Sequence, residues 1–183
     1  MKKFLIVLFI LVQGLIFAAG KNLADIKTLK FDVVEKTTIK SKKRELTYKI
    51  DFILPNKIKK EVIAPKLNKG EIYMYDYSAN KKSVYLPMFN ETKESEIVDD
   101  ENRIIKAINK IIEEEKTNKN FKQKYNAKKA QSLNIDKQIS ITISTYLEVD
   151  GYIFPETVQI KDSGTKIADV KISNLQINPK IEM

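Results

Sequence analysis

Three consecutive segments with the alternation of β-strands occupy residues 46–77. In the first of them every second residue is apolar, which is typical of a strand with one buried face. Pro55 and Asn56 end that segment, because proline cannot donate a backbone hydrogen bond and asparagine favours turns. Pro65 and a turn that contains Gly70 separate the other two segments. Since sequential strands usually pair, the sequence predicts an antiparallel meander on which the rest of the fold builds.

Further segments with strand character lie on both sides of this meander. We expect strands over residues 31–39, 83–89, 138–149, 152–160 and 167–177. Asp150 and Gly151 separate two of them, and Asp-Gly is a strong hairpin signal. The charged residues 40–45 are expected at a hairpin tip, and the acidic residues 90–100 in a loop. A short strand within residues 130–135 is left open.

One segment has the period of an amphipathic α-helix. Within residues 101–116, one apolar stripe is formed by Ile104, Ile105, Ile108, Ile111 and Ile112. Charged side chains cover the other faces, and Asp99 or Asp100 is expected to cap the first turn. A shorter amphipathic helix is expected over residues 21–30, whereas residues 117–129 fit a loop, a helix extension or a short strand.

The first 20 residues have the pattern of a secretory signal peptide. Two lysines precede an apolar run, and the small residues Ala18, Ala19 and Gly20 close it. We expect cleavage after about Gly20 and a periplasmic mature protein. An uncleaved membrane anchor is the alternative, although the run is a little short for a span. Residues 21–183 are long enough for one domain with a sizeable core, and a single domain is predicted.

The composition excludes several classes of function. The 183 residues contain no cysteine and no histidine, which removes disulfides, the commonest metal ligand and the usual general base. The formal net charge of +9 comes almost entirely from lysine, because Arg44 and Arg103 are the only arginines. Since nucleic-acid readout usually depends on arginine, we expect no nucleic-acid partner. The acidic residues 99–101 lack the spacing of a calcium loop, and residues 113–115 fit a solvated helix face. We therefore expect no metal, no cofactor and no enzyme.

The order of these elements predicts the fold class. It is α+β: a long antiparallel sheet that curls into an incomplete, or half, β-barrel and is covered by α-helices. The isoleucine helix, inserted between strands, is the available cover for the concave face. An enclosure of this kind is either a packed core or a cavity for an apolar ligand, and the residue pattern leaves both readings open.

The meander resembles the periplasmic carriers of outer-membrane lipoproteins, the LolA-like family. Matching positions are Pro55, Asn56, Pro65, Gly70, Tyr75 and Asp76, and the C-terminal residues 170–181 resemble the family's closing strand. The resemblance implies a LolA/LolB-like half-barrel under a helical lid. In the carriers an arginine before the Pro-Asn pair helps to hold the lid closed, whereas this chain has Leu54 there.

The resemblance also implies a function, that of a monomeric chaperone sheltering the acyl chains of lipoproteins between the inner and outer membranes. Its partners would be acylated lipoproteins, an ATP-driven inner-membrane transporter and an outer-membrane acceptor. The acyl-contact candidates are Leu46, Tyr48, Ile50, Phe52, Leu54, Ile72, Met74, Ile139, Ile141, Ile143 and Leu147. The isoleucine stripe forms the lid, and ordinary core packing is the competing explanation for every one of these residues.

Two other readings compete with the carrier. One is a periplasmic sensory, regulatory or small-lipid-binding domain on the same fold. The other is a hydrolase that uses only carboxylates, for which the adjacent acidic residues are the sole candidates. The acceptor-type relative of the carriers is anchored through a cysteine, which this chain does not have.

Overall fold

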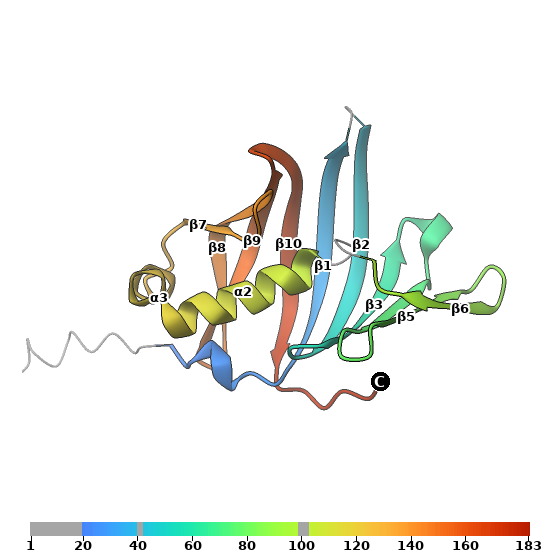
Figure 1. Ribbon diagram of the computed structural model, residues 1–183, viewed down its shortest axis with the longest axis horizontal. Helices are drawn as coiled ribbons and strands as arrows, with labels where there is room; N and C mark the ends of the chain where they lie inside the picture. Colours follow the sequence, from blue (N-terminus) through green and yellow to red (C-terminus); the bar gives the residue numbers. More distant parts are fainter. Residues whose placement is uncertain (1–19, 40–41, 99–102) are drawn as a thin grey trace, which may run out of the picture.

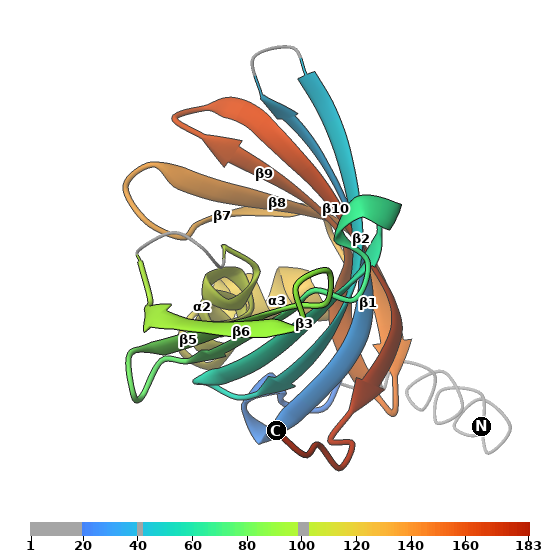
Figure 2. The same cartoon turned by 90° about the vertical axis from the view of Figure 1, so that its right-hand side faces the viewer.

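The computed structural model describes residues 20–39, 42–98 and 103–183. In these residues ten strands form one antiparallel sheet, and two α-helices lie across its concave side (Figure 1). The strand order is β6-β5-β4-β3-β2-β1-β10-β9-β8-β7, so the first and last strands of that order are open edges. Figure 2 shows the sheet curling around the helices without closing. The predicted α+β half-barrel covered by helices is therefore confirmed. The signal-peptide segment and both capping candidates lie outside the described residues.

The strands are β1 (Thr28–Ile39), β2 (Lys42–Ile53), β3 (Lys57–Ala64), β4 (Ile72–Asp76), β5 (Lys81–Leu86), β6 (Glu91–Glu96), β7 (Gln131–Asn134), β8 (Ile139–Val149), β9 (Tyr152–Asp162) and β10 (Thr165–Ile177). The helices are α2 (Arg103–Thr117) and α3 (Lys119–Asn126), with short 3-10 turns η1 (Leu23–Asp25) and η2 (Lys66–Asn68). The predicted meander corresponds to β2–β4, and β5 ends one residue before Pro87.

The centre of the sheet follows from the period-two pattern. The register pairs Phe31 with Ile50 and Val33 with Tyr48, and all four side chains are buried. Directly paired residues of antiparallel strands share a face, so these side chains build the concave wall together. Phe31 also meets Phe154 of β9, with ring centroids 6.3 Å apart. One continuous core therefore spans both halves of the chain.

The topology explains why the helices lie where they do. β6 and β7 are the two edges of the sheet, yet β7 is the strand that follows β6 in the chain. The connection between them must cross the width of the sheet, and α2 and α3 make that crossing on the concave side (Figure 2). The isoleucine stripe of α2 is the sequence feature that selects this side, since it needs an apolar surface to cover it.

Residues 21–30 do not form the amphipathic helix that was predicted for them. Residues 21–30 contain only the 3-10 turn η1, after which β1 already begins at Thr28. Leu23 and Ile26 are buried, and Leu29 is buried as the second residue of the strand. A spacing of three residues thus arises here from one tight turn followed by an extended chain, a pattern that imitates a short helix.

Two polar segments are strands rather than connections. β6 occupies part of the expected loop, with every side chain exposed, and β2 begins at Lys42 inside the expected hairpin tip. β6 is an edge strand, and charged edges discourage pairing with other chains. Alternation cannot reveal a strand that has water on both faces, which is why the sequence pattern indicated a loop.

The two segments left open are now assigned. Within the open segment 117–129, α3 occupies Lys119–Asn126, and its first turn is capped by Asn118: the side-chain oxygen of Asn118 accepts a hydrogen bond from the Phe121 amide at 3.1 Å. Phe121 and Tyr125 are the buried residues of this helix. The short strand within residues 130–135 is β7.

The core should be sensitive to truncation at Phe52, which is fully buried opposite Ile58. Phe52→Ala removes a ring from this packed layer, and we expect a loss of about 3–5 kcal/mol in the free energy of unfolding. Urea unfolding followed by circular dichroism measures it. Met88→Ala, at an exposed site, is the control, and equal effects of both variants would contradict the described core.

Candidate functional site

The concave face of the sheet and the apolar stripe of α2 form the candidate site. Ile105, Ile108 and Ile111 are buried, and Ile104 and Ile112 are partly buried against the same core. The predicted lid helix therefore does cover the sheet, and its stripe faces inward. In this arrangement the space between helix and sheet is filled by the side chains of both.

Most of the proposed acyl-contact residues line this face. Tyr48, Ile50, Phe52, Ile139, Ile141 and Ile143 are buried in the core, while Leu46, Leu54 and Leu147 are partly buried and pack against it. The alternation of β8 changes after Ile143, where the register with β9 shifts twice. Thr145 is exposed, and Tyr146 packs on Tyr125 of α3, with ring centroids 5.2 Å apart.

β4 presents a different face from the one expected. Ile72 and Met74 were assigned to the concave side, but the register pairs Tyr75 with the buried Ile58, and Tyr75 is buried as well. Met74 is 40% exposed on the opposite side of the strand. Both alternate sets of this strand are apolar or aromatic, so its period could not decide between Ile72 with Met74 and Tyr73 with Tyr75.

A polar contact joins α2 to the turn after β2. The Asn109 side-chain amide donates a hydrogen bond to the Pro55 carbonyl at 3.1 Å. Leu54 lines a surface cavity of about 670 Å³ beside α2 together with Ile112 and Lys116. The helix thus supplies the polar side chain, and the turn after β2 supplies a backbone acceptor.

An ion pair also joins the two helices. Glu115 is only 3% exposed, and its carboxylate pairs with Lys122 of α3 at 2.6 Å. Tyr125 donates a hydrogen bond to the Ile153 carbonyl of β9 at 3.1 Å, and its burial raises the pKa of its hydroxyl well above the usual value. Glu115 was expected on a solvated face, and this prediction was wrong because α3 packs over that side of α2.

The remaining acidic residues of α2 have ordinary structural partners. Glu113 and Glu114 lie 2.9 and 3.3 Å from the Lys110 ammonium, three and four residues further along the helix. Within the described ranges, no three acidic side chains gather into a possible metal site. None of the described helices is long and apolar enough to cross a membrane.

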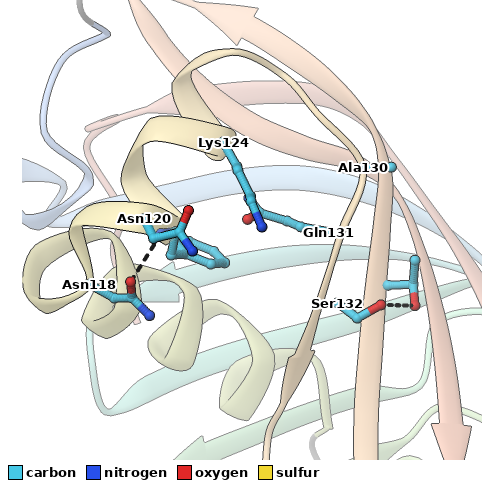
Figure 3. Close-up of a pocket in the computed structure, with 8 residues that line it drawn as sticks. Asn118, Asn120, Lys124, Ala130, Gln131 and Ser132 are labelled. Carbon is cyan, nitrogen blue, oxygen red and sulfur yellow. Dashed lines mark hydrogen bonds between the residues drawn. The ribbon is translucent and has the colours of Figure 1, made fainter.

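A surface groove lies between α3 and β7. Asn118, Asn120, Lys124, Ala130, Gln131 and Ser132 surround about 520 Å³ of it (Figure 3). Its hydroxyls satisfy each other, since Ser132 lies 2.9 Å from the Thr142 hydroxyl, and Asn118 is engaged as the cap of α3. None of the residues that line this surface groove is acidic, so it offers no carboxylate as a base or metal ligand.

Asp76 and Gly70, two of the positions that resemble the carrier pattern, stabilise turns. Asp76 accepts hydrogen bonds from the Ser78 hydroxyl at 2.7 Å and from the Ser78 and Ala79 amides, and it pairs with Lys57 at 3.0 Å. Gly70 has φ +85°, and a β-carbon there would lie 3.4 Å from Pro87 of the next turn. These positions therefore determine how the strands connect, rather than what the concave face binds.

Comparison with known proteins identifies the fold. No protein-family model matches the sequence, and no curated protein matches it. The solved structure of a LolA superfamily protein from Nitrosomonas europaea superposes with a TM-score of 0.53 and 7% identity, covering 86% of this chain and 89% of that one. The chain has a LolA-like fold. A DUF1329 family protein from Desulfovibrio piger shares it, with a TM-score of 0.55, 10% identity, and coverage of 87% and 89%.

The LolA-like arrangement should depend on the Asn109 contact. Asn109→Ala leaves the Pro55 carbonyl without its partner, and we expect a loss of about 0.5–1.5 kcal/mol in stability. Hydrogen exchange of the α2 amides should become faster, while the amides of β8 and β9 should keep their protection. Unchanged exchange throughout α2 would show that the contact does not restrain the helix.

Asp76 should contribute to stability only above acidic pH. Hydrogen bonds from Ser78, together with Lys57, lower the pKa of its carboxyl to about 2. A folded-state pKa below the unfolded one stabilises the fold above about pH 4, and this contribution disappears as the pH falls through about 2. Asp76→Asn should therefore reduce stability at pH 6 more than at pH 2. Urea unfolding at both pH values measures the difference, with Asp25→Asn as the matched control.

Proposed function

We propose that this protein is a periplasmic carrier of acylated lipoproteins. The observation that supports it best is the apolar concave sheet covered by the amphipathic helix α2, in a fold shared with a LolA superfamily protein. The predicted signal peptide adds a route to the periplasm. The concave residues and the stripe of α2 then serve as contacts for acyl chains, and no side chain has a catalytic role.

In this proposal the described state is the empty, closed carrier. Cargo chains and α2 compete for the same surface, because Ile105, Ile108 and Ile111 now bury it. Exposing three isoleucines costs roughly 5–9 kcal/mol. An acyl chain of about ten methylenes recovers roughly 8 kcal/mol on burial. The two terms are of similar size, so one or two chains suffice to displace the helix without unfolding the sheet.

The carrier cannot extract its own cargo. Lifting a lipoprotein with three chains from a bilayer into water costs on the order of 30 kcal/mol at about 0.8 kcal/mol per methylene. Non-covalent affinity saturates near ~20 kcal/mol. We therefore propose that an ATP-driven inner-membrane transporter loads this protein and that an outer-membrane acceptor with higher affinity unloads it.

A sensory or small-lipid-binding domain remains the second candidate. The cavities at the margins of the concave face favour it, since a single small amphiphile could enter without displacing α2. The two functions differ in cargo: one moves an acylated protein and the other binds a free lipid.

The release of lipoprotein from membranes tests the proposal. Inner-membrane vesicles that hold newly made lipoproteins and the matching transporter are incubated with the mature protein, with and without ATP. We expect lipoprotein in the soluble fraction, bound to this protein, only with ATP. Absence of release from vesicles that a known carrier can empty would contradict the carrier function.

A photo-crosslinking amino acid at single sites locates the cargo. Introduced at Ile141 or Ile108, it should trap lipoprotein, because both side chains face the helix–sheet interface. Met74 is the matched control, since it is exposed on the other face of the sheet. Crosslinking from Met74 alone would place the cargo outside the half-barrel.

A further inference from the structure

The concave face is not apolar throughout. At the ends of β1–β4 away from the Asn109 contact, it forms a cavity of about 340 Å³, and no residue of either helix lines it. Its walls include Glu35, Arg44, Leu46, Lys60, Val62, Asn68, Glu71 and Tyr73. This volume lies within the range of small-ligand sites. The cavity is thus open even while α2 covers the rest of the face.

Lys60 belongs to the inner wall. The register pairs it with Ile50 and Tyr73, and it alternates along β3 with the buried Ile58 and Val62. Its ammonium lies 4.1 Å from the centre of the Tyr48 ring and 5.8 Å from that of Tyr73. Burial lowers the pKa of this lysine, and the neighbouring carboxylates of Glu35 and Glu71 oppose the shift.

The two carboxylates are held by neutral donors. The Tyr48 hydroxyl donates to Glu35 at 2.8 Å, and the Tyr73 hydroxyl donates to Glu71 at 2.7 Å. Within the part of the chain that the structure describes, the Lys60 ammonium has no carboxylate within ion-pair distance. A structural ion pair would bring these charges together. Here the Lys60 ammonium and the carboxylates of Glu35 and Glu71 lie on one wall beyond ion-pair distance, and each can form a further hydrogen bond.

The charged and apolar side chains of the cavity wall determine which ligand it can bind. The Lys60 ammonium, with Arg44 at the cavity, can donate to phosphate oxygens. A ligand amine would be attracted by Glu35 and Glu71 and by the faces of the two tyrosine rings. Leu46 and Val62 give the same cavity an apolar side. A group with one phosphate and one amine, attached to an aliphatic chain, satisfies all three parts.

We propose that this cavity binds the phosphoethanolamine group of a zwitterionic phospholipid. The site goes beyond the lipoprotein cargo, because its headgroup contacts Lys60, Glu35 and Glu71 are not among the proposed acyl contacts. A lipid held there has its headgroup among these three side chains, and its chains leave along the apolar side of the cavity formed by Leu46 and Val62.

Titration calorimetry with short-chain lipids tests the site. The probes are dihexanoyl phosphatidylethanolamine, its phosphatidylglycerol analogue, and glycerophosphoethanolamine without chains. We expect the ethanolamine lipid to bind at least about tenfold more tightly than the glycerol lipid. Binding of the chain-free probe at equal affinity would assign the site to a soluble phosphodiester, whereas a requirement for chains assigns it to a lipid. Equal binding of the two lipids, or none, overturns the proposal.

Matched variants on β1 and β3 separate binding from folding. Lys60→Met and Glu35→Gln should each weaken the binding of the ethanolamine lipid by about tenfold or more. Lys59→Met and Glu61→Gln are the controls, since both residues lie next to Lys60 on the opposite face of β3. Thermal unfolding confirms that each variant folds. Equal loss in the Lys59 and Lys60 variants, or no loss in either, overturns the assignment.

The lipoprotein-release assay on the same variants keeps the two proposals distinguishable. We expect Lys60→Met to lose headgroup binding while ATP-dependent release continues. Failure of release in the unaltered protein would refute the carrier function and leave the calorimetric result unaffected. Loss of both properties together in Lys60→Met, with the fold intact, would contradict the separation of the two sites.

Discussion

The apolar concave face of the sheet is the constraint on which the rest of the structure depends. A curled sheet turns aliphatic and aromatic side chains toward one interior, and that surface cannot remain in water. The chain solves this through its topology, because the connection from β6 to β7 has to pass from one edge to the other. α2 makes this passage with its isoleucine stripe facing the sheet. The same segment completes the core and, in a carrier, is the part that cargo must displace.

The polar contacts of the helices lie at the margins of that interface. Asn109 reaches the turn after β2, Lys122 neutralises Glu115 between the two helices, and Tyr125 bonds to β9. The stripe itself is held by packing alone, which is non-directional and which another apolar surface can replace. Leu54 lies beside the turn that Asn109 reaches, and Asn109 supplies the polar contact from the helix side.

Much of the fold could be predicted from period and turn signals. The alternating runs gave β2 and β8–β10, and the isoleucine stripe placed α2 to within two residues at each end. β6 was missed because an edge strand in water has no apolar face. Ile72 and Met74 were assigned to the wrong face because β4 is apolar on both faces. A signal for the interior charge did exist: Lys60 stands between Ile58 and Val62 in the alternation of β3. What it contacts depends on pairing with β2 and β4, which one strand's pattern cannot show.

The pairing of β1 with β10 also has a consequence for how the chain reaches this structure. These two strands meet in the middle of the sheet, with Leu29 paired to Ile177 near the opposite end of the sequence. Contacts so distant in sequence form slowly, because a long loop must close before they stabilise anything. A chain emerging from its N-terminus can assemble β1–β6 while the free edge of β1 still waits for the last strand. During that interval one edge of β1 is unpaired at the centre of the future sheet, where it can pair with another copy.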